Sequence, residues 1–382
     1  MSNAALVGIG VVGCGQRLRT ICSHLMRHES LQIVSLYDPN PAQMQRFVDE
    51  CGISRSVERC ESWEAVLENP RVAWVCIGSP NSFHYGQTRA ALQAGKHVFL
   101  EKPLATTADD CIDLLRLRRE HDRRIVTGFV LRYSPLYRSV KQLLQERKFG
   151  SMLTIQANEN ISYAHAAYIM RGWRRKSDVA GPHILEKCIH DIDIMQWMSG
   201  SRFSKIAAVG GRSIFSCAHR GLYPPEILAS WESKGNLDSS DPFSDDEITI
   251  EDHIQLQAEG ENGVKTQFTA VAGAAMPERR LSISCVGGSI TAELYSGTLR
   301  YRTIDMDHEA QLQWFEGGLH GGGDGVLADE LQSVMSDDAD PAVELKEGVW
   351  ANIAALAADE ARRSAAWIDL RPYWRRADAL DQ

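Results

Sequence analysis

The first third of the chain alternates between short apolar runs and amphipathic stretches of helical period. The runs are nearly continuous in apolar residues and read ALVGIGVV (5–12), QIVSLYD (32–38), VAWVCIGSP (72–80), KHVFLEKP (96–103) and RIVTGFV (124–130). Between them lie segments such as RTICSHLMRH and HYGQTRAALQAG. Apolar strands separated by helices are typical of a parallel sheet that is covered on both faces. The pattern predicts an α/β, doubly wound nucleotide-binding domain.

After about residue 150 the pattern changes. Several strand-like runs follow one another with short glycine-containing turns, among them DHIQLQAEG, VKTQFTAVAG and RRLSISCVGG. Consecutive strands of this kind predict a second, α+β domain with a large, open-faced, mostly antiparallel sheet. We divide the chain into residues 1–127 and 128–382. We expect a helix over 184–197 and a solvated loop in the acidic segment 235–252.

The open sheet would leave a large apolar face uncovered in a monomer. Such faces are usually buried against another subunit, so we expect a homodimer or homotetramer.

Composition narrows the classes of function. Residues 1–150 contain 20 Lys and Arg against 15 Asp and Glu, whereas residues 151–382 contain 21 against 35. The basic half suits an anionic cofactor, and the acidic half argues against a nucleic-acid partner. No run approaches the roughly 20 apolar residues of a membrane span, and no signal peptide is recognisable. Nine scattered cysteines indicate reduced thiols and a cytoplasmic location.

Two glycine fingerprints overlap in GIGVVGCGQRL. Gly8, Gly10 and Gly13 complete a G-x-G-x-x-G motif, whereas Gly13 and Gly15 give only G-x-G, with Leu18 at the third position. A fingerprint binds a nucleotide only where a strand ends at its first glycine and a helix follows. A strand ending before Gly8 would be too short to cross a sheet. The incomplete frame at Gly13 is therefore the predicted nucleotide loop, with the pyrophosphate at the helix N-terminus.

Asp38 follows the second apolar run, 23 residues after Gly15. A carboxylate in that position accepts a hydrogen bond from a ribose 2′-hydroxyl and repels a 2′-phosphate, which predicts NAD rather than NADP. A helix cap or turn in DPNPAQ is the alternative interpretation.

The segment AGKHVFLEKPLA, together with the Gly13 loop, resembles the Gfo/Idh/MocA family of oxidoreductases. GSPNSFHYGQTRAALQAGKH is similar to the T-P-N-x-x-H stretch of that family, and GPHILEKCIHDIDIMQWMSG to its D-x-x-x-H-x-x-D motif. Here EKCIH replaces the more usual D-x-G-x-H, so Glu186 stands where the family has aspartate. The resemblance implies a Rossmann domain that binds a pyridine nucleotide and a second domain that binds a sugar, cyclic polyol or sugar derivative.

The resemblance also implies site residues. Lys102 would be the active-site lysine, His190 the acid/base histidine, and Glu186 their carboxylate partner. Residues expected to bind the cofactor are Gly13, Gly15, Gln16, Arg17, Asp38, Ser79, Pro80, Asn81, His84, Glu101 and Lys102. Residues expected to contact substrate are Lys102, Arg132, Tyr133, Trp173, Arg174, Glu186 and His190.

Residue chemistry agrees with these roles. Oxidation of a secondary alcohol removes a hydride from carbon, which a nicotinamide accepts, and a proton from oxygen, which the protein must accept. A histidine suits proton transfer near neutral pH, and a lysine ammonium stabilises a developing alkoxide. Lys102 as the proton acceptor is the alternative. If their segment is one helix, Glu186, His190 and Asp193 share a face at i, i+4 and i+7.

Other functions stay open at this point. The same groups could oxidise a glycoside hydroxyl transiently, eliminate the aglycone and then reduce the product, with no net change of NAD. A sensor that binds sugar and NAD without chemistry is less favoured. A metal site is disfavoured, because the sequence contains no water-activating arrangement such as H-E-x-x-H.

Overall fold

The computed structural model describes residues 6–146, 149–232, 240–314 and 320–381. The chain packs into two compact units. The first unit comprises Met1–Ser134, Gly322–Val349 and Arg376–Gln382, and the second comprises Pro135–Gly321 and Trp350–Arg375. The single boundary expected after residue 127 stays a prediction, and two C-terminal segments return to the first unit.

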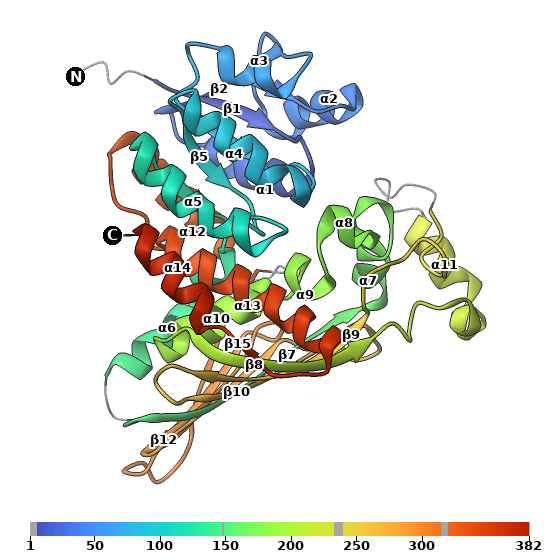
Figure 1. Cartoon of the computed structure of the whole chain (residues 1–382), viewed down its shortest axis with the longest axis vertical. Coiled ribbons are helices and arrows are strands. Elements are labelled where there is room, and N and C mark those ends of the chain that lie inside the picture. Colours follow the sequence, from blue (N-terminus) through green and yellow to red (C-terminus); the bar gives the residue numbers. More distant parts are fainter. Residues whose placement is uncertain (1–5, 147–148, 233–239, 315–319, 382) are drawn as a thin grey trace. The chain divides into compact units, whose positions relative to one another are not determined.

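The first unit contains a six-stranded parallel sheet in the order β3-β2-β1-β4-β5-β6. Its strands are β1 (Val7–Val12), β2 (Leu31–Tyr37), β3 (Glu58–Arg59), β4 (Trp74–Ile77), β5 (His97–Leu100) and β6 (Ile125–Thr127). Strands β1, β2 and β5 of this sheet are labelled in Figure 1. The inner strands consist almost entirely of buried apolar residues, as a sheet covered on both faces requires. This is the predicted doubly wound fold.

Helices connect these strands and cover the sheet. They are α1 (Gln16–Leu25), α2 (Pro41–Glu50), α3 (Trp63–Glu68), α4 (His84–Gln93) and α5 (Ala108–His121), with short 3₁₀ turns η1 (Asn81–Phe83) and η2 (Val130–Tyr133). Helix α12 (Gly323–Ser336) comes from far along the chain and packs against α1. Sequence order alone gives no sign of that return.

The second unit contains a nine-stranded sheet in the order β14-β13-β12-β11-β7-β10-β9-β8-β15. Its strands are β7 (Met152–Ser162), β8 (Phe203–Gly211), β9 (His253–Gly260), β10 (Lys265–Ala274), β11 (Arg280–Cys285), β12 (Gly288–Glu293), β13 (Thr298–Thr303), β14 (Ala310–Gln313) and β15 (Ile368–Asp369). Among the described strands of this sheet, only β7 and β10 pair in parallel, so the expected mostly antiparallel sheet is confirmed.

The second unit also contains helices and 3₁₀ turns. They are α6 (Pro135–Gln145), α7 (Tyr163–Ile169), η3 (Gly172–Arg175), α8 (Ser177–Ala180), α9 (His183–Glu186), α10 (Ile189–Ser199), η4 (Cys217–Leu222) and α11 (Pro225–Glu232). Helices α6, α7 and α10 pack against the large sheet, whereas α11 packs against α7 (Figure 1). Helices α13 (Leu345–Ser364) and α14 (Arg371–Asp381) each contribute to both units. The prediction of a single helix over 184–197 is wrong, because a turn at Lys187 and Cys188 separates α9 from α10.

The uncovered face of the large sheet is polar, which corrects the expected apolar face. Residues that alternate with the buried ones on β9 and β10 include Gln255, Gln257, Lys265 and Gln267, all of them exposed. The two-residue period of a strand sends these polar side chains outward and their apolar neighbours into the core. An uncovered apolar face therefore no longer supports an oligomer, and the homodimer or homotetramer stays a prediction.

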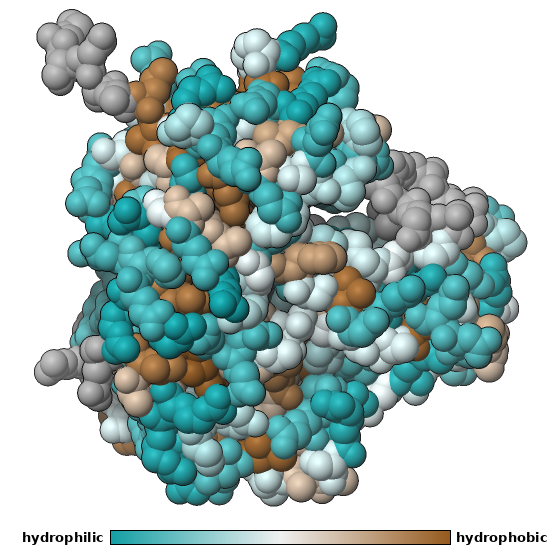
Figure 2. Space-filling view, turned by 45° about the horizontal axis from the view of Figure 1, so that its top comes forward, coloured by the Kyte–Doolittle hydropathy of each residue, from teal (hydrophilic) through white to brown (hydrophobic). Residues whose placement is uncertain are grey.

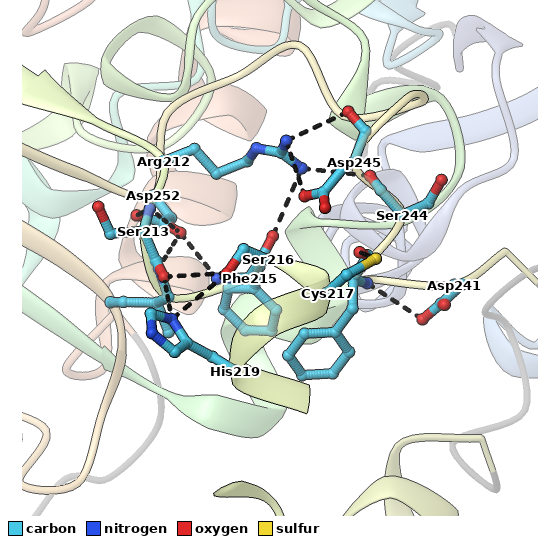
Figure 3. A network of polar contacts seen from close by, with 12 residues as sticks. Arg212, Ser213, Phe215, Ser216, Cys217, His219, Asp241, Ser244, Asp245 and Asp252 are labelled. Atoms are coloured by element: carbon cyan, nitrogen blue, oxygen red, sulfur yellow. Dashed lines mark hydrogen bonds and ion pairs between the residues drawn. The ribbon is translucent and has the colours of Figure 1, made fainter. Parts of the chain in front are cut away.

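Part of the acidic segment 235–252 packs inward. Residues 235–239 lie outside the described residues, but Phe243, Ile248 and Ile250 are buried in a cluster with α7. The buried carboxylate of Asp252 accepts hydrogen bonds from the backbone N–H groups of residues 213, 214 and 215 (Figure 3). Arg212 joins this turn to Asp245 through an ion pair of 3.1 Å. The expected solvated loop is thus wrong for the described part.

All nine cysteines are free thiols, and Cys217 is the exposed one. Among the described residues, no helix combines the length and the apolar character needed to cross a membrane. On the face drawn in Figure 2, hydrophobic residues lie in small groups between hydrophilic ones.

Candidate active site

The residues predicted to bind a cofactor gather at one edge of the parallel sheet. Gly13, Asp38, Ser79 and Glu101 directly follow, or lie one residue beyond, the carboxyl ends of β1, β2, β4 and β5. Strands β1 and β4 are neighbours, and the chain leaves them in opposite directions across the sheet. Such a switch in strand order is where open α/β sheets bind their ligands.

The glycine loop has the shape that a dinucleotide requires. Gly13 has a φ of +90°, and a Cβ there would lie 2.7 Å from the backbone of Gly78 and Ser79. A Cβ on Gly15 would meet nothing within 4 Å, so the loop is open on that side. Helix α1 begins at Gln16 with no side-chain cap and no acidic residue in its first turn. Uncapped N–H groups at a helix N-terminus suit a pyrophosphate, so these residues fit NAD.

Asp38 is held beside this loop. One carboxylate oxygen, Oδ2, accepts a hydrogen bond from the backbone N–H of Cys14 at 2.9 Å, and the other accepts one from Asn40 at 2.9 Å. Each carboxylate oxygen can accept more than one hydrogen bond. The same carboxylate can therefore fix the loop and accept from a ribose hydroxyl.

Leu18, at the position of the missing third glycine, packs over Gly78. A Cβ on Gly78 would lie 2.6 Å from Leu18 Cγ. In the usual fingerprint the third glycine lets helix and strand approach closely. Here the side chain is on the helix, and the glycine that makes room for it follows β4.

The EKP segment continues from β5. The buried Glu101 accepts a hydrogen bond from Arg17 Nε at 2.8 Å, and Arg17 also pairs with Asp324 of α12. Lys102 is partly exposed and precedes Pro103 through a cis peptide bond. The guanidinium of Arg17, an expected cofactor ligand, thus joins the glycine loop to the EKP segment. The sequence does not predict the role of Asp324, because no local pattern indicates that it pairs with Arg17.

His84 connects two of the loops at this edge. Its Nδ1 lies 2.6 Å from the carbonyl oxygen of Pro103, and its Nε2 lies 2.9 Å from that of Ser79. The side chain is 1% exposed. The structure therefore places His84 beneath the cofactor edge, and Asn81 beside it is also buried.

In the second unit, Glu186 and His190 flank the break between α9 and α10. Glu186 is the last residue of α9, and His190 is the second residue of α10. Both are buried, at 7% and 4% exposure. The ring of His190 lies 6.0 Å, centroid to centroid, from the ring of His320. The expected single helix is interrupted between these two residues, and each of them is buried.

Arg174 is held firmly beside Glu186. Its Nε donates to Glu186 Oε1 at 3.1 Å. Its guanidinium lies over the rings of Tyr168 and Trp173, with 4.3 Å to each centroid. Glu186, Arg174 and Trp173, all expected to contact substrate, are thus in one cluster. Tyr168 was not anticipated, because a lone tyrosine in a short helix carries no signal.

Arg132 and Tyr133 are in a different setting. Both are buried in the first unit, where Arg132 Nη1 pairs with Glu347 Oε2 at 2.9 Å and the Tyr133 hydroxyl donates to Glu330 Oε1 at 2.6 Å. These partners hold both side chains within the first unit, and the predicted contact of Arg132 and Tyr133 with substrate stays a prediction. Among the described residues, no group of His, Cys, Asp or Glu side chains could hold a metal ion.

Comparison with known proteins identifies the family. Inositol 2-dehydrogenase of Ralstonia nicotianae is 29% identical over 261 residues, which are 68% of this chain and 73% of that enzyme. Inositol 2-dehydrogenase/D-chiro-inositol 3-dehydrogenase of Lactiplantibacillus plantarum is 24% identical over 229 residues, 60% of this chain and 61% of that enzyme. The structure of a levoglucosan dehydrogenase in complex with NADH and levoglucosan has the same fold, with a TM-score of 0.79 over 95% of this chain and 99% of that one, at 17% identity.

Family models cover most of the sequence. Residues 7–129 match the NAD-binding Rossmann fold of the Gfo/Idh/MocA oxidoreductases, and residues 137–291 match the C-terminal domain of the same family. The glycine loop, the EKP segment and the Glu186–His190 pair agree with that assignment. The chain therefore belongs to the Gfo/Idh/MocA family of NAD-binding oxidoreductases.

Proposed function

We propose that the protein is an NAD-dependent dehydrogenase that oxidises a secondary hydroxyl of a sugar, cyclic polyol or sugar derivative. The observation that carries this proposal is the burial of both Glu186 and His190 in a chain whose first unit has an open, uncapped dinucleotide loop. The relatives named as inositol dehydrogenases support a polyhydroxylated substrate.

His190 is the proposed acid/base group. NAD, when bound, supplies the hydride acceptor. In oxidation, the imidazole of His190 takes the hydroxyl proton while the C–H bond loses its hydride, which converts the alcohol to a ketone. The reverse reaction returns the proton from the imidazolium. A histidine is suited to both directions near neutral pH.

The remaining side chains have supporting roles in this proposal. The ammonium of Lys102 stabilises negative charge on the reacting oxygen. Glu186 and Arg174 fix substrate hydroxyls, because their ion pair and the ring stack around Arg174 hold both in place. Asp38 selects NAD, since its carboxylate repels a 2′-phosphate.

The test is a panel of myo-inositol, glucose, levoglucosan and a phenyl glycoside, each with NAD and with NADP, followed at the NADH absorbance band. We expect NADH formation with at least one member and a preference for NAD. His190→Ala should lower kcat by roughly 10²–10⁴-fold and leave NAD affinity unchanged. Lys102→Ala should lower kcat strongly as well.

His308→Ala and Lys265→Ala are matched controls, because both side chains are exposed in the second unit. Their kinetics should equal those of the wild type. Full turnover by His190→Ala would refute the assignment. Release of phenol without net NADH would instead identify a glycoside-cleaving enzyme that works by transient oxidation.

A further inference from the structure

We propose that Lys187, one of four charged residues in a buried network, is a positioning residue for His190. The inference rests on the proposed function, because it concerns the acid/base group of that reaction. The other members of the network are Glu159 on β7, Arg279 just before β11, and Asp191 on α10.

The network is continuous in hydrogen-bond distance. Lys187 Nζ lies 2.9 Å from Glu159 Oε1, and Arg279 Nη1 lies 3.0 Å from the same oxygen. Arg279 then binds Asp191 in a bidentate manner, with Nε to Oδ1 at 2.9 Å and Nη2 to Oδ2 at 2.6 Å. Through Glu159 and Asp191, Arg279 thus connects strand β7 to helix α10, the helix that contains His190.

The four side chains are removed from water and balance one another. Arg279 and Glu159 are 1% exposed, the side chain of Asp191 is 5% exposed and that of Lys187 is 12% exposed. With both carboxylates ionised, the two cations balance the two anions and the network has no net charge. Burial raises the pKa of Asp191 to about 7, while its bidentate contact with Arg279 favours the ionised form. Burial opposes ionisation of Glu159, but Arg279 and Lys187 hold its pKa well below the usual range. Removing one member would leave an uncompensated buried charge.

This network acts on the segment where helical hydrogen bonding is interrupted. Helix α9 ends at Glu186 and α10 begins at Ile189, so Lys187 and Cys188 form the connection that precedes His190. The network fixes this segment at Lys187 on one side of His190 and at Asp191 on the other. EKCIH departs from the family pattern D-x-G-x-H at this lysine, and Lys187 is the residue that pairs with the carboxylate of Glu159 on β7.

Lys187 and Asp191 flank His190 in sequence, so we expect a change in the charge of the network to shift the protonation of His190. Further groups surround the network and His190 on several elements. They are Glu186 and Asp193 on the segment itself, His183 on α9, His165 on α7, Arg174 on η3 and His320 in its loop. Burial and the ammonium of Lys187 lower the pKa of His165 to about 3, which keeps it neutral. The changes described below alter the network charge and leave these groups in place.

The experiment is an NMR titration of histidine side chains in the full-length protein, which needs no substrate. The His190 signal is assigned by its loss in His190→Gln. Lys187→Met leaves the network with a net negative charge and should raise the pKa of His190 by about one unit. Glu159→Gln should lower it by a similar amount. The double variant restores neutrality and should return the pKa toward the wild-type value.

Kinetics separate positioning from charge balance. With the best substrate of the panel above, Lys187→Met and the double variant should both lose at least about tenfold in kcat at similar KM, because neither ties the segment to β7. Lys187→Arg, which keeps the charge and the reach, should recover most of the rate. Lys265→Met with Glu259→Gln is the matched control and should change neither quantity, because this ion pair of 2.9 Å lies at the surface, with Lys265 exposed and Glu259 half-buried.

Two results would overturn the proposal. One is a His190 pKa that is the same in the wild type and all three network variants. The other is a double variant that regains both wild-type thermal stability and wild-type kcat, which would make the network a matter of charge balance alone. If no panel member is oxidised by the wild type, the proposed function fails, while the titration still decides whether the network controls His190.

Discussion

Replacement of Gly78 by alanine tests whether this glycine substitutes for the missing third glycine of the fingerprint. The new Cβ would lie 2.6 Å from Leu18 Cγ and 2.9 Å from Leu18 Cδ1. Carbon atoms in contact prefer about 3.5–4.0 Å, so the helix and the strand end must separate by about 1 Å. Overpacking of this kind costs roughly 1–3 kcal/mol of unfolding free energy.

A double-mutant cycle makes the reasoning specific. Leu18 is 1% exposed, so Leu18→Ala alone should cost roughly 2–5 kcal/mol through the cavity that it leaves. In the double variant, the methyl group of the new alanine occupies part of that cavity. The double variant should therefore be more stable than the sum of the single changes predicts, by about 1–2 kcal/mol.

The assay is urea unfolding followed by circular dichroism, with NAD affinity measured in parallel. Gly86→Ala is the control, because a Cβ at that position of α4 would meet nothing within 4 Å. It should be neutral or slightly stabilising, since alanine favours helix more than glycine does. The reasoning is refuted if Gly78→Ala behaves like Gly86→Ala, or if the two changes at Leu18 and Gly78 are additive.

Three further predictions concern other side chains. Arg132→Met removes the buried partner of Glu347 and should lower the unfolding free energy by roughly 3 kcal/mol with little change in KM. A large rise in KM at wild-type stability would contradict this and would support contact of Arg132 with substrate. Asp38→Ala should weaken NAD binding and admit NADP, and titration with both nucleotides would contradict this if the preference stayed the same. The pKa of His165 is lowered to about 3 in the folded chain against about 6.5 in the unfolded one, so only the unfolded chain gains this proton between those values. Protonation of His165 in the unfolded chain should therefore lower the unfolding free energy by about 2 kcal/mol between about pH 7 and about pH 5. Urea unfolding of His165→Gln should show a pH dependence that is smaller by this amount. The same pH dependence in the wild type and the variant would refute the assignment.

The first unit could be predicted largely from sequence, because its signals are local. The continuous apolar runs give the strands, and strand length identifies the glycine frame: β1 ends at Val12 and α1 begins at Gln16. A carboxylate after the second strand falls beside the loop because parallel strands end at one edge of the sheet. What could not be predicted is the return of α12 to this unit, since the Arg17–Asp324 pair spans 307 residues.

In the second unit the predictions failed where tertiary contacts outweigh local pattern. The segment around His190 has helical composition throughout, but the buried Glu159 draws Lys187 to β7 at the point where the helix breaks. The acidic stretch before β9 looks solvated in sequence, but Asp252 is buried because three backbone N–H groups point at its carboxylate. In both cases a charged residue is inside because a partner far away in sequence satisfies it.

The overlapping fingerprints show why a motif needs a structural context. Gly8 and Gly10 belong to the complete motif, but both lie inside β1, where side chains are excluded for packing reasons. A Cβ on Gly8 would lie 1.9 Å from the carbonyl oxygen of Arg71, and one on Gly10 would lie 2.5 Å from Val66 Cγ1 of α3. The glycines between Gly8 and Gly15 therefore have two different causes: Gly8 and Gly10 make room for residues packed against β1, and Gly13 allows the turn that follows the strand. Only Gly13, with its φ of +90°, turns the chain toward a helix N-terminus, and that is why the incomplete motif is the one that fits a nucleotide.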